Sequence, residues 1–368
     1  MSAVRKILGV AWRPAVCALL MVWILHAIFL NEGRLSWQRE GQSWDALARP
    51  EQWHVAWSRG PRELWQTLTL VEPEALLLSI LFMGLTILIG VIRWRMVLRV
   101  HGLHLSFGRA TEISLVAHFF NSFLLGSTGG DLLKAYYAAR ETHHKKTEAV
   151  VTVFVDRLVG LFAMLSFAGL MMLPNLQLLF SHPRLAAVAW FILAMLLGCG
   201  LMVGASFWGG VSWTLPRARQ WVRRLPKGEL LERSLDACRE FGRDRGFLFR
   251  AMTLSMAANA VCVFQILALA WGLKLAISPV ALFVIVPIII CISALPVTPS
   301  GLGVRENLYV LMLAVPEINV PATQALSLSL LAYAGSLFWS ATGGVVYLTL
   351  KRRHQLDEVT EARVVGAN

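Results

Sequence analysis

The sequence GSTGGD at residues 126–131 interrupts an apolar run, and a second polar interruption, PVTPSGLGVRE, lies at residues 296–306. Glycine and proline break helices and leave backbone N–H and C=O groups unpaired, and hydrocarbon offers those groups no partner. Such breaks persist only where they line a cavity or are buried in protein. Each break also carries a carboxylate, which costs about 2.5–3.5 kcal/mol near the bilayer centre. Two broken, charged segments in an apolar chain therefore predict the two walls of one polar site.

The composition is that of an integral membrane protein. Of the 368 residues, 57% are hydrophobic and only 15% are charged, which is more apolar surface than a soluble domain of this size must bury. The net charge of +12 comes from basic residues in short loops beside the apolar runs. There they set orientation and meet anionic lipid headgroups, so nucleic acid is not the expected partner.

No pattern in the sequence indicates catalysis, a cofactor or a metal site. The five cysteines have neither metal-type nor redox-type spacing. His118, His143 and His144 lack the carboxylates that would complete a metal shell. A serine elbow, a phosphate-binding loop and a dinucleotide fingerprint are all missing. We therefore expect no cofactor, no metal and no catalytic residue.

The apolar runs divide the chain into about six full spans and two pairs of shorter segments. Full spans, each near the roughly 20 residues that cross a bilayer, are expected at residues 12–30, 75–92, 149–173, 185–208, 251–273 and 323–350. The remaining apolar segments are too short or too polar to cross and form two re-entrant helical hairpins, at residues 111–146 and 279–315. The sequence thus predicts an all-α polytopic transmembrane helical bundle, one domain over residues 1–368.

The distribution of basic residues predicts the topology. Most of the 34 Lys and Arg residues lie in segments assigned to the inner side, which places both termini in the cytoplasm, and we expect the bacterial inner (plasma) membrane. The two hairpins then enter from opposite faces, as inverted-topology repeats do in transporters. Sequence similarity between the halves is weak, so an inverted repeat is a hypothesis.

Two loops and one span end have a distinctive composition. Residues 31–74 form an outer Trp-rich loop, which either rests on the membrane through short amphipathic helices or acts as a lid that guides substrate. Residues 209–250 form a basic cytoplasmic loop, in which Leu231, Leu235, Cys238 and Phe241 predict a helix on the inner leaflet. Arg93-Trp94-Arg95 predicts a cytoplasmic exit with an aromatic ring at headgroup level.

Charged residues at membrane depth balance in sign. Three carboxylates stand against three cations, the six being Asp131, Asp156, Glu306, Lys134, Arg157 and Arg305. Adjacent helical residues point about 100° apart, so Asp156 and Arg157 must find partners on other elements. Guanidinium groups and helix N-termini both suit phosphate, which in a membrane means a lipid headgroup. The alternative is a set of static salt bridges between helices.

At these residues the chain resembles the lysylphosphatidylglycerol synthase transmembrane region family, also called flippase-like proteins. Three motifs, in the expected order within about residues 75–350, carry the resemblance: Asn121 with Gly126, Gly129, Gly130 and Asp131; Asp156, Arg157 and Gly160; and Pro296, Pro299, Gly301, Gly303, Arg305 and Glu306. The family usually has proline in place of Leu125 and arginine in place of Lys134. Bifunctional members add a soluble aminoacyl transferase domain, so this chain is expected to be the stand-alone portion, without synthase activity.

The resemblance and the charges together predict a lipid flippase or translocase that moves an anionic or zwitterionic phospholipid between leaflets. The expected binding residues are Asn121, Gly126, Thr128, Gly129, Gly130, Asp131, Lys134, Asp156, Arg157, Thr298, Ser300, Gly301, Gly303, Arg305 and Glu306. Two alternatives stay open: a membrane-embedded transferase acting on lipid-linked phosphate, and a non-transporting membrane scaffold. The sequence also leaves open which lipid binds and whether the protein is a homo-oligomer.

Overall fold

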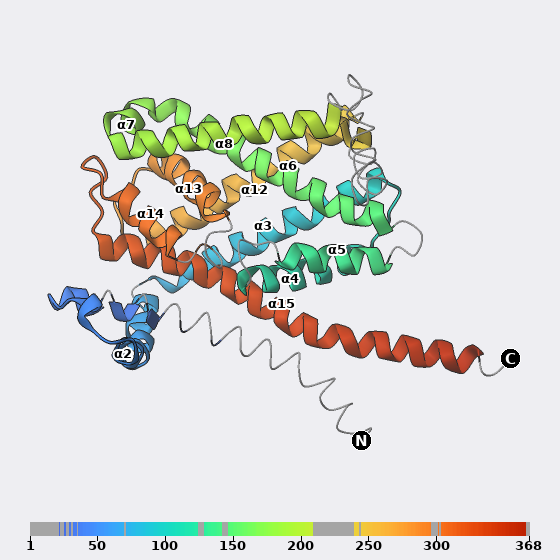
Figure 1. Cartoon of the computed structure of the whole chain (residues 1–368), viewed down its shortest axis with the longest axis horizontal. Coiled ribbons are helices and arrows are strands. Elements are labelled where there is room, and N and C mark those ends of the chain that lie inside the picture. Colours follow the sequence, from blue (N-terminus) through green and yellow to red (C-terminus); the bar gives the residue numbers. More distant parts are fainter. Residues whose placement is uncertain are drawn as a thin grey trace.

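The computed structural model describes residues 22, 26, 29–30, 32–34, 36–69, 71–123, 129–141, 146–208, 239–242, 244–295, 301 and 303–365. Within these ranges every regular element is a helix. The long helices lie side by side in one bundle, and the shorter ones fill it or cap its ends (Figure 1). The predicted all-α polytopic membrane fold is confirmed.

Five helices form the spans of the bundle. They are α3 (Pro73–Val100), α6 (Lys146–Met172), α8 (Pro183–Trp208), α12 (Arg245–Gly272) and α15 (Ala322–Val365). Each contains a stretch long and apolar enough to cross a membrane. These helices confirm five of the six predicted spans. The remaining one, at residues 12–30, lies almost entirely outside the described residues.

Two pairs of shorter helices occupy the predicted hairpin positions. The first pair is α4 (Phe107–Phe123) and α5 (Gly129–Glu141), and the second is α13 (Pro279–Ser293) and α14 (Val304–Leu313). The members of each pair contact one another, and the pairs lie toward opposite ends of the bundle (Figure 1). This arrangement agrees with the prediction of two opposed hairpins, whose bends at residues 124–128 and 296–300 lie outside the described residues. The inverted repeat stays a prediction.

Close helix packing at glycines brings the long helices together. Helix α3 packs along α12, and α4 packs along α15. A Cβ added at Gly343 would lie 2.1 Å from the backbone oxygen of Leu115, so only glycine lets α15 approach α4 this closely. On α15, Trp339 donates from Nε1 to the Ile80 carbonyl of α3 at 2.9 Å, which gives the partly buried indole a hydrogen-bond partner.

The remaining helices precede the first of the five spans or connect two spans. The Trp-rich segment at residues 31–74 forms a 3₁₀ helix, η1 (Trp44–Ala46), and a long helix, α2 (Arg49–Thr69). Between α6 and α8 lie η2 (Leu173–Asn175) and α7 (Leu176–Ser181). His182, just before α8, makes a hydrogen bond between its Nε2 and Glu317 Oε2 at 3.0 Å. This contact joins the α7–α8 corner to the loop after α14.

Two segments that the sequence analysis assigns to the cytoplasmic side need comment. Most of the basic loop at residues 209–250, including Leu231, Leu235 and Cys238, lies outside the described residues. Phe241 is fully buried and packs edge-on against His101, with ring centroids 4.7 Å apart, so this side chain faces the bundle. Helix α15 continues beyond the predicted span end at residue 350, because the residues that follow include many good helix formers.

Candidate functional site

The first hairpin is closed by Asn121 and Gly130. The Asn121 side-chain oxygen accepts a hydrogen bond from the Gly130 backbone N–H at 2.8 Å. A Cβ added at Gly130 would lie 1.8 Å from the Ala117 carbonyl oxygen, so any side chain here would force α5 away from α4. These two residues therefore hold the hairpin together. Of the other predicted residues nearby, Gly129 is buried, whereas Gly126 and Thr128 lie outside the described residues.

Four charged residues cross-link α5 to α6. Asp131 and Lys134, one turn apart on α5, face Asp156 and Arg157 on α6. Arg157 donates from Nε to Asp131, and Lys134 donates from Nζ to Asp156 Oδ2 at 3.2 Å. Each member of the adjacent pair on α6 thus has its own partner on another helix, as predicted. The buried Lys134 ammonium also lies 4.2 Å from the centre of the Trp94 ring, a cation–π contact.

Arg93 of α3 is the residue that ties this cluster to the rest of the bundle. Its Nε donates to Asp156 Oδ1 at 2.8 Å, and its Nη1 donates to Ser255 Oγ of α12 at 2.9 Å. A Cβ added at Gly160, one turn after Asp156, would lie 2.9 Å from Arg93 Nη2. The Asp-Arg-x-x-Gly motif therefore has a direct geometric meaning: Asp156 receives the guanidinium, and Gly160 leaves the space it occupies.

The aromatic ring that the Arg93-Trp94-Arg95 sequence predicts at headgroup level does not face lipid, and the cytoplasmic exit stays a prediction. Trp94 is fully buried, with its ring against Lys134, and the Arg93 side chain turns into the bundle. The enrichment of aromatic and basic residues at the ends of spans is a statistical tendency, and it contains no information about partners on distant helices. A better signal lay in α12, where Ser255 and Asn259 stand four residues apart in an apolar span, because polar groups at membrane depth usually face a partner or a cavity.

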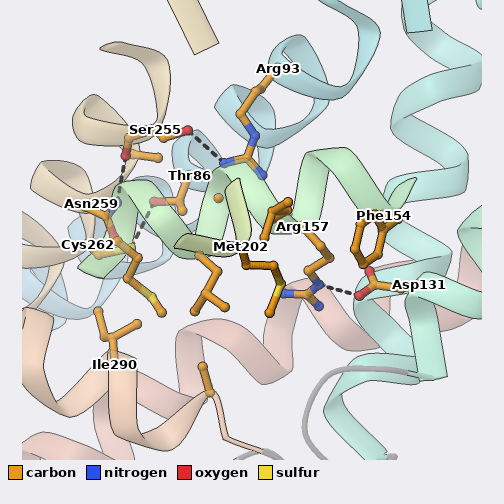
Figure 2. Close-up of a pocket in the computed structure, with 16 residues that line it drawn as sticks. Thr86, Arg93, Asp131, Phe154, Arg157, Met202, Ser255, Asn259, Cys262 and Ile290 are labelled. Atoms are coloured by element: carbon orange, nitrogen blue, oxygen red, sulfur yellow. Dashed lines mark hydrogen bonds and ion pairs between the residues drawn. The ribbon is translucent and has the colours of Figure 1, made fainter. Parts of the chain in front are cut away.

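A pocket of about 570 Å³ opens beside this cluster (Figure 2). Helices α3, α5, α6, α8, α12 and α13 line it. The polar lining is Thr86, Arg93, Asp131, Arg157, Ser255, Asn259 and Cys262, and the apolar lining includes Phe154, Leu158, Leu161, Met164, Met202 and Ile290. Thr86 lies near the middle of α3, and Leu161 lies near the middle of α6, so the pocket is at the mid-depth of the spans.

The charges around the pocket leave an excess of positive charge. Among the described residues of the cluster, three cations (Arg93, Lys134 and Arg157) stand against two carboxylates (Asp131 and Asp156). Asp156 is almost fully buried, whereas the Arg157 side chain is 47% exposed. Guanidinium groups therefore dominate the accessible polar lining. The described residues contain no group of His, Cys, Asp and Glu side chains that could hold a metal ion.

The remaining predicted charges form a separate cluster at the start of α14. Arg305 donates from Nη2 to Glu306 Oε1 at 2.7 Å and from Nε to Ser329 Oγ of α15 at 3.2 Å. Glu306 Oε2 accepts from the Gly303 N–H at 2.6 Å. Gly301 and Gly303 have positive φ angles of 69° and 82°, which favour glycine. This cluster fastens the second hairpin to α15.

The predicted single cluster of six charges is therefore two clusters in the structure. Neither Arg305 nor Glu306 lines the pocket, and the partners described above belong to α14 and α15. The other two predicted residues of this motif, Thr298 and Ser300, lie outside the described residues. Sequence spacing could not separate the clusters, because the distance between the hairpins is set by how the spans pack.

Comparison with known proteins gives the family. Residues 52–343 match the model of the family described as "Lysylphosphatidylglycerol synthase TM region". A curated relative, the UPF0104 membrane protein of Methanothermobacter thermautotrophicus, is 25% identical over 301 residues, which cover 74% of this chain and 83% of the relative. The matched residues contain both hairpins, the charged cluster and the pocket. The chain is thus an integral membrane protein that belongs to the lysylphosphatidylglycerol synthase transmembrane region family.

Proposed function

We propose that this protein is a lipid translocase, which moves a phospholipid with an anionic or zwitterionic headgroup between leaflets. The observation that carries the proposal is the pocket at mid-depth of the spans, which contains the guanidinium groups of Arg93 and Arg157, other polar side chains and many apolar side chains. Its volume of about 570 Å³ is within the usual range of ligand sites. A planar guanidinium can donate two hydrogen bonds to one phosphate, which suits a phospholipid headgroup.

The two arginines differ in how readily they can take a ligand. The Arg157–Asp131 pair is partly exposed, with Arg157 47% accessible, and such pairs are worth only about 0–1 kcal/mol. Arg93 is held by Asp156 and Ser255 in a mostly buried setting. A phosphate therefore replaces Asp131 at Arg157 first, while Arg93 keeps its place and adds positive potential. The carboxylate of Asp131, once released, suits the ammonium of a zwitterionic headgroup.

The apolar lining accounts for the lipid part of the ligand. Phe154, Leu161 and Met202 lie in the same pocket as the guanidinium groups, and Phe154 is 53% exposed. Acyl chains follow these side chains into the surrounding bilayer while the headgroup stays beside the guanidinium groups. Since the sequence contains no nucleotide-binding motif, movement is downhill or coupled to an ion gradient. We place both termini on the cytoplasmic side of the bacterial plasma membrane, from the basic loops.

The test is leaflet exchange in liposomes that contain the purified protein. Fluorescently labelled phosphatidylglycerol, phosphatidylethanolamine and phosphatidylcholine are each incorporated, and accessibility to a membrane-impermeant quencher is followed with time. Arg157→Gln should slow exchange by about tenfold or more, because a charge-assisted hydrogen bond is worth about 1.5–3 kcal/mol. Arg95→Gln is the matched control, since Arg95 bonds to the Leu105 carbonyl at 3.2 Å and does not line the pocket.

The outcomes separate the three functions. Equal exchange in empty and protein-containing vesicles for every headgroup rules out a translocase. A new lipid species in the mass spectrum of the vesicles would instead indicate a transferase. If Arg157→Gln changes only thermal stability and no lipid moves or reacts, the protein is a scaffold. Mass spectrometry of lipid that co-purifies in mild detergent identifies the substrate.

A further inference from the structure

Helix α2 has a surface divided into three sectors, and its first sector packs against protein. Ala56 is fully buried, and a Cβ added at Gly33 would lie 2.9 Å from the Ala56 Cα. Gly60 is in similarly close contact with Phe29, because a Cβ added at Gly60 would lie 2.6 Å from the Phe29 Cβ. This side of α2 is therefore occupied by the preceding segment of the chain.

The second sector carries three exposed indoles. Trp53, Trp57 and Trp65 are 57%, 45% and 69% exposed. Their spacings of four and eight residues place them within about 120° of helix surface, at about 100° per residue. The third sector contains the exposed polar residues Arg62 and Gln66 and, two turns nearer the start of the helix, the buried Val55. The exposed surface of α2 is thus divided between an indole face, defined as Trp53, Trp57 and Trp65, and a polar face.

The chain connection fixes where α2 lies. It ends at Thr69, and α3 begins at Pro73, so the gap is at most about 14 Å. The linker is held in place, because Val71 is buried and the Glu72 N–H donates to the Gly272 carbonyl at the end of α12 at 3.3 Å. The apolar part of α3 starts directly after this point. Helix α2 therefore lies at the headgroup level of one leaflet, at the end of the bundle (Figure 1).

We propose that α2 docks on the membrane through its indole face, and that its partner is the phospholipid surface of the leaflet at the amino end of α3. Indole rings prefer this interface because they combine an apolar body with a polar N–H group. Two of the rings are held in position: Trp57 donates from Nε1 to His26 Nδ1 at 2.8 Å, and Trp53 packs edge-on against the same imidazole at 5.0 Å. The inference depends on the spans and the linker, and not on the proposed transport.

Site-directed spin labelling tests the docking in the full-length chain. The five native cysteines are replaced by alanine, and a nitroxide is attached at Trp65→Cys or, as the matched control, at Gln66→Cys. The two positions are adjacent and both exposed, but they point about 100° apart, toward the two faces. In liposomes, the label at position 65 should collide more with oxygen, and the label at position 66 should collide more with a water-soluble nickel complex.

Two results would overturn the proposal. Equal access of the nickel complex to both labels means that the indole face is in water. A label at position 65 that is immobile and inaccessible to both reagents means that protein covers this face, either a second copy or another segment of this chain. If the cysteine-free chain does not fold, brominated lipids test the native chain. Trp65→Phe should then remove a quenched part of the emission, whereas Trp44→Phe should not, because Trp44 is buried.

Discussion

Replacing Asp156 by asparagine should destabilise the protein more than any other single change of charge in the cluster. Asp156 accepts from Arg93 at 2.8 Å and from Lys134 at 3.2 Å, and its side chain is only 8% exposed. A neutral amide at this position would leave these two cations without a carboxylate in a region of low dielectric constant. Breaking a buried ion pair by removing one partner costs about 3–5 kcal/mol. The folding equilibrium constant should therefore fall by roughly two to four orders of magnitude, at about 1.4 kcal/mol per factor of ten.

A double mutant at positions 134 and 156 gives the sign of the coupling free energy between the two side chains. Lys134→Met alone leaves Asp156 paired with Arg93, so it should cost about 1.5–3 kcal/mol, the value of one charged hydrogen bond. In Lys134→Met/Asp156→Asn one of the unpaired cations is gone. The double mutant should therefore be more stable than the sum of the single effects predicts, by about 1–3 kcal/mol. Glu141→Gln is the control, because Glu141 is a more exposed partner of Arg109 than Asp156 is of Arg93, and its loss should cost less than the loss of Asp156.

Equilibrium unfolding in mixed micelles, followed by tryptophan fluorescence, measures these free energies. Trp94, one of the 14 tryptophans, lies directly against Lys134, so the cluster contributes to the change in emission on unfolding. The electrostatic reasoning is refuted if Asp156→Asn is no more destabilising than Glu141→Gln. It is also refuted if the effects of Lys134→Met and Asp156→Asn are additive, since the two groups would then not interact.

Three further predictions concern other parts of the molecule. Gly130→Ala should lower the melting temperature strongly, because its Cβ would meet the α4 backbone, whereas Gly108→Ala, with nothing within 4 Å of the added atom, should not. Gly160→Ala should displace the Arg93 guanidinium and slow lipid exchange without unfolding the protein, as thermal melts would confirm. The pKa of Glu317 lies below its ordinary 4.5, because its own backbone N–H and a histidine donate to it. Its stabilising effect is thus present at neutral pH and lost in acid, so melting of the wild type but not of Glu317→Gln should show this loss as the pH falls below 4.5.

Hydropathy was sufficient to predict the long helices, because a bilayer imposes a minimum apolar length on every span. The predicted segments at residues 149–173 and 185–208 differ from α6 and α8 by only a few residues at each end. The short runs around the two glycine-rich breaks were also identified as helix pairs, since each was too short or too polar to cross. Helix α15 extends further than predicted, because the polar residues after the span still favour a helix.

The equal numbers of carboxylates and cations predicted that the charges would pair. They did not predict that the pairs would form two separate clusters. Asp156 was expected to pair with a cation on another helix, and it does. That Arg93, 63 residues earlier, is one of its partners depends on how α3 packs against α6. Arg305 and Glu306 pair with each other, and their attachment to Ser329 sets them apart from the pocket. Sequence patterns describe one element at a time, whereas the pocket is formed by six helices that meet in three dimensions.

The contact between Gly130 and the α4 backbone has a mechanical consequence. Because Gly130 has no side chain, α5 rests directly on the Ala117 carbonyl and on the Asn121 side chain of α4, which leaves α5 little room to slide or tilt against α4. Helices α4 and α5 are therefore held closely together at this contact, and a displacement of α4 would carry Asp131 and Lys134 of α5 with it. A motion that opens the Asp131–Arg157 pair would therefore occur between α5 and α6, which the ion pairs of Asp131 and Lys134 connect.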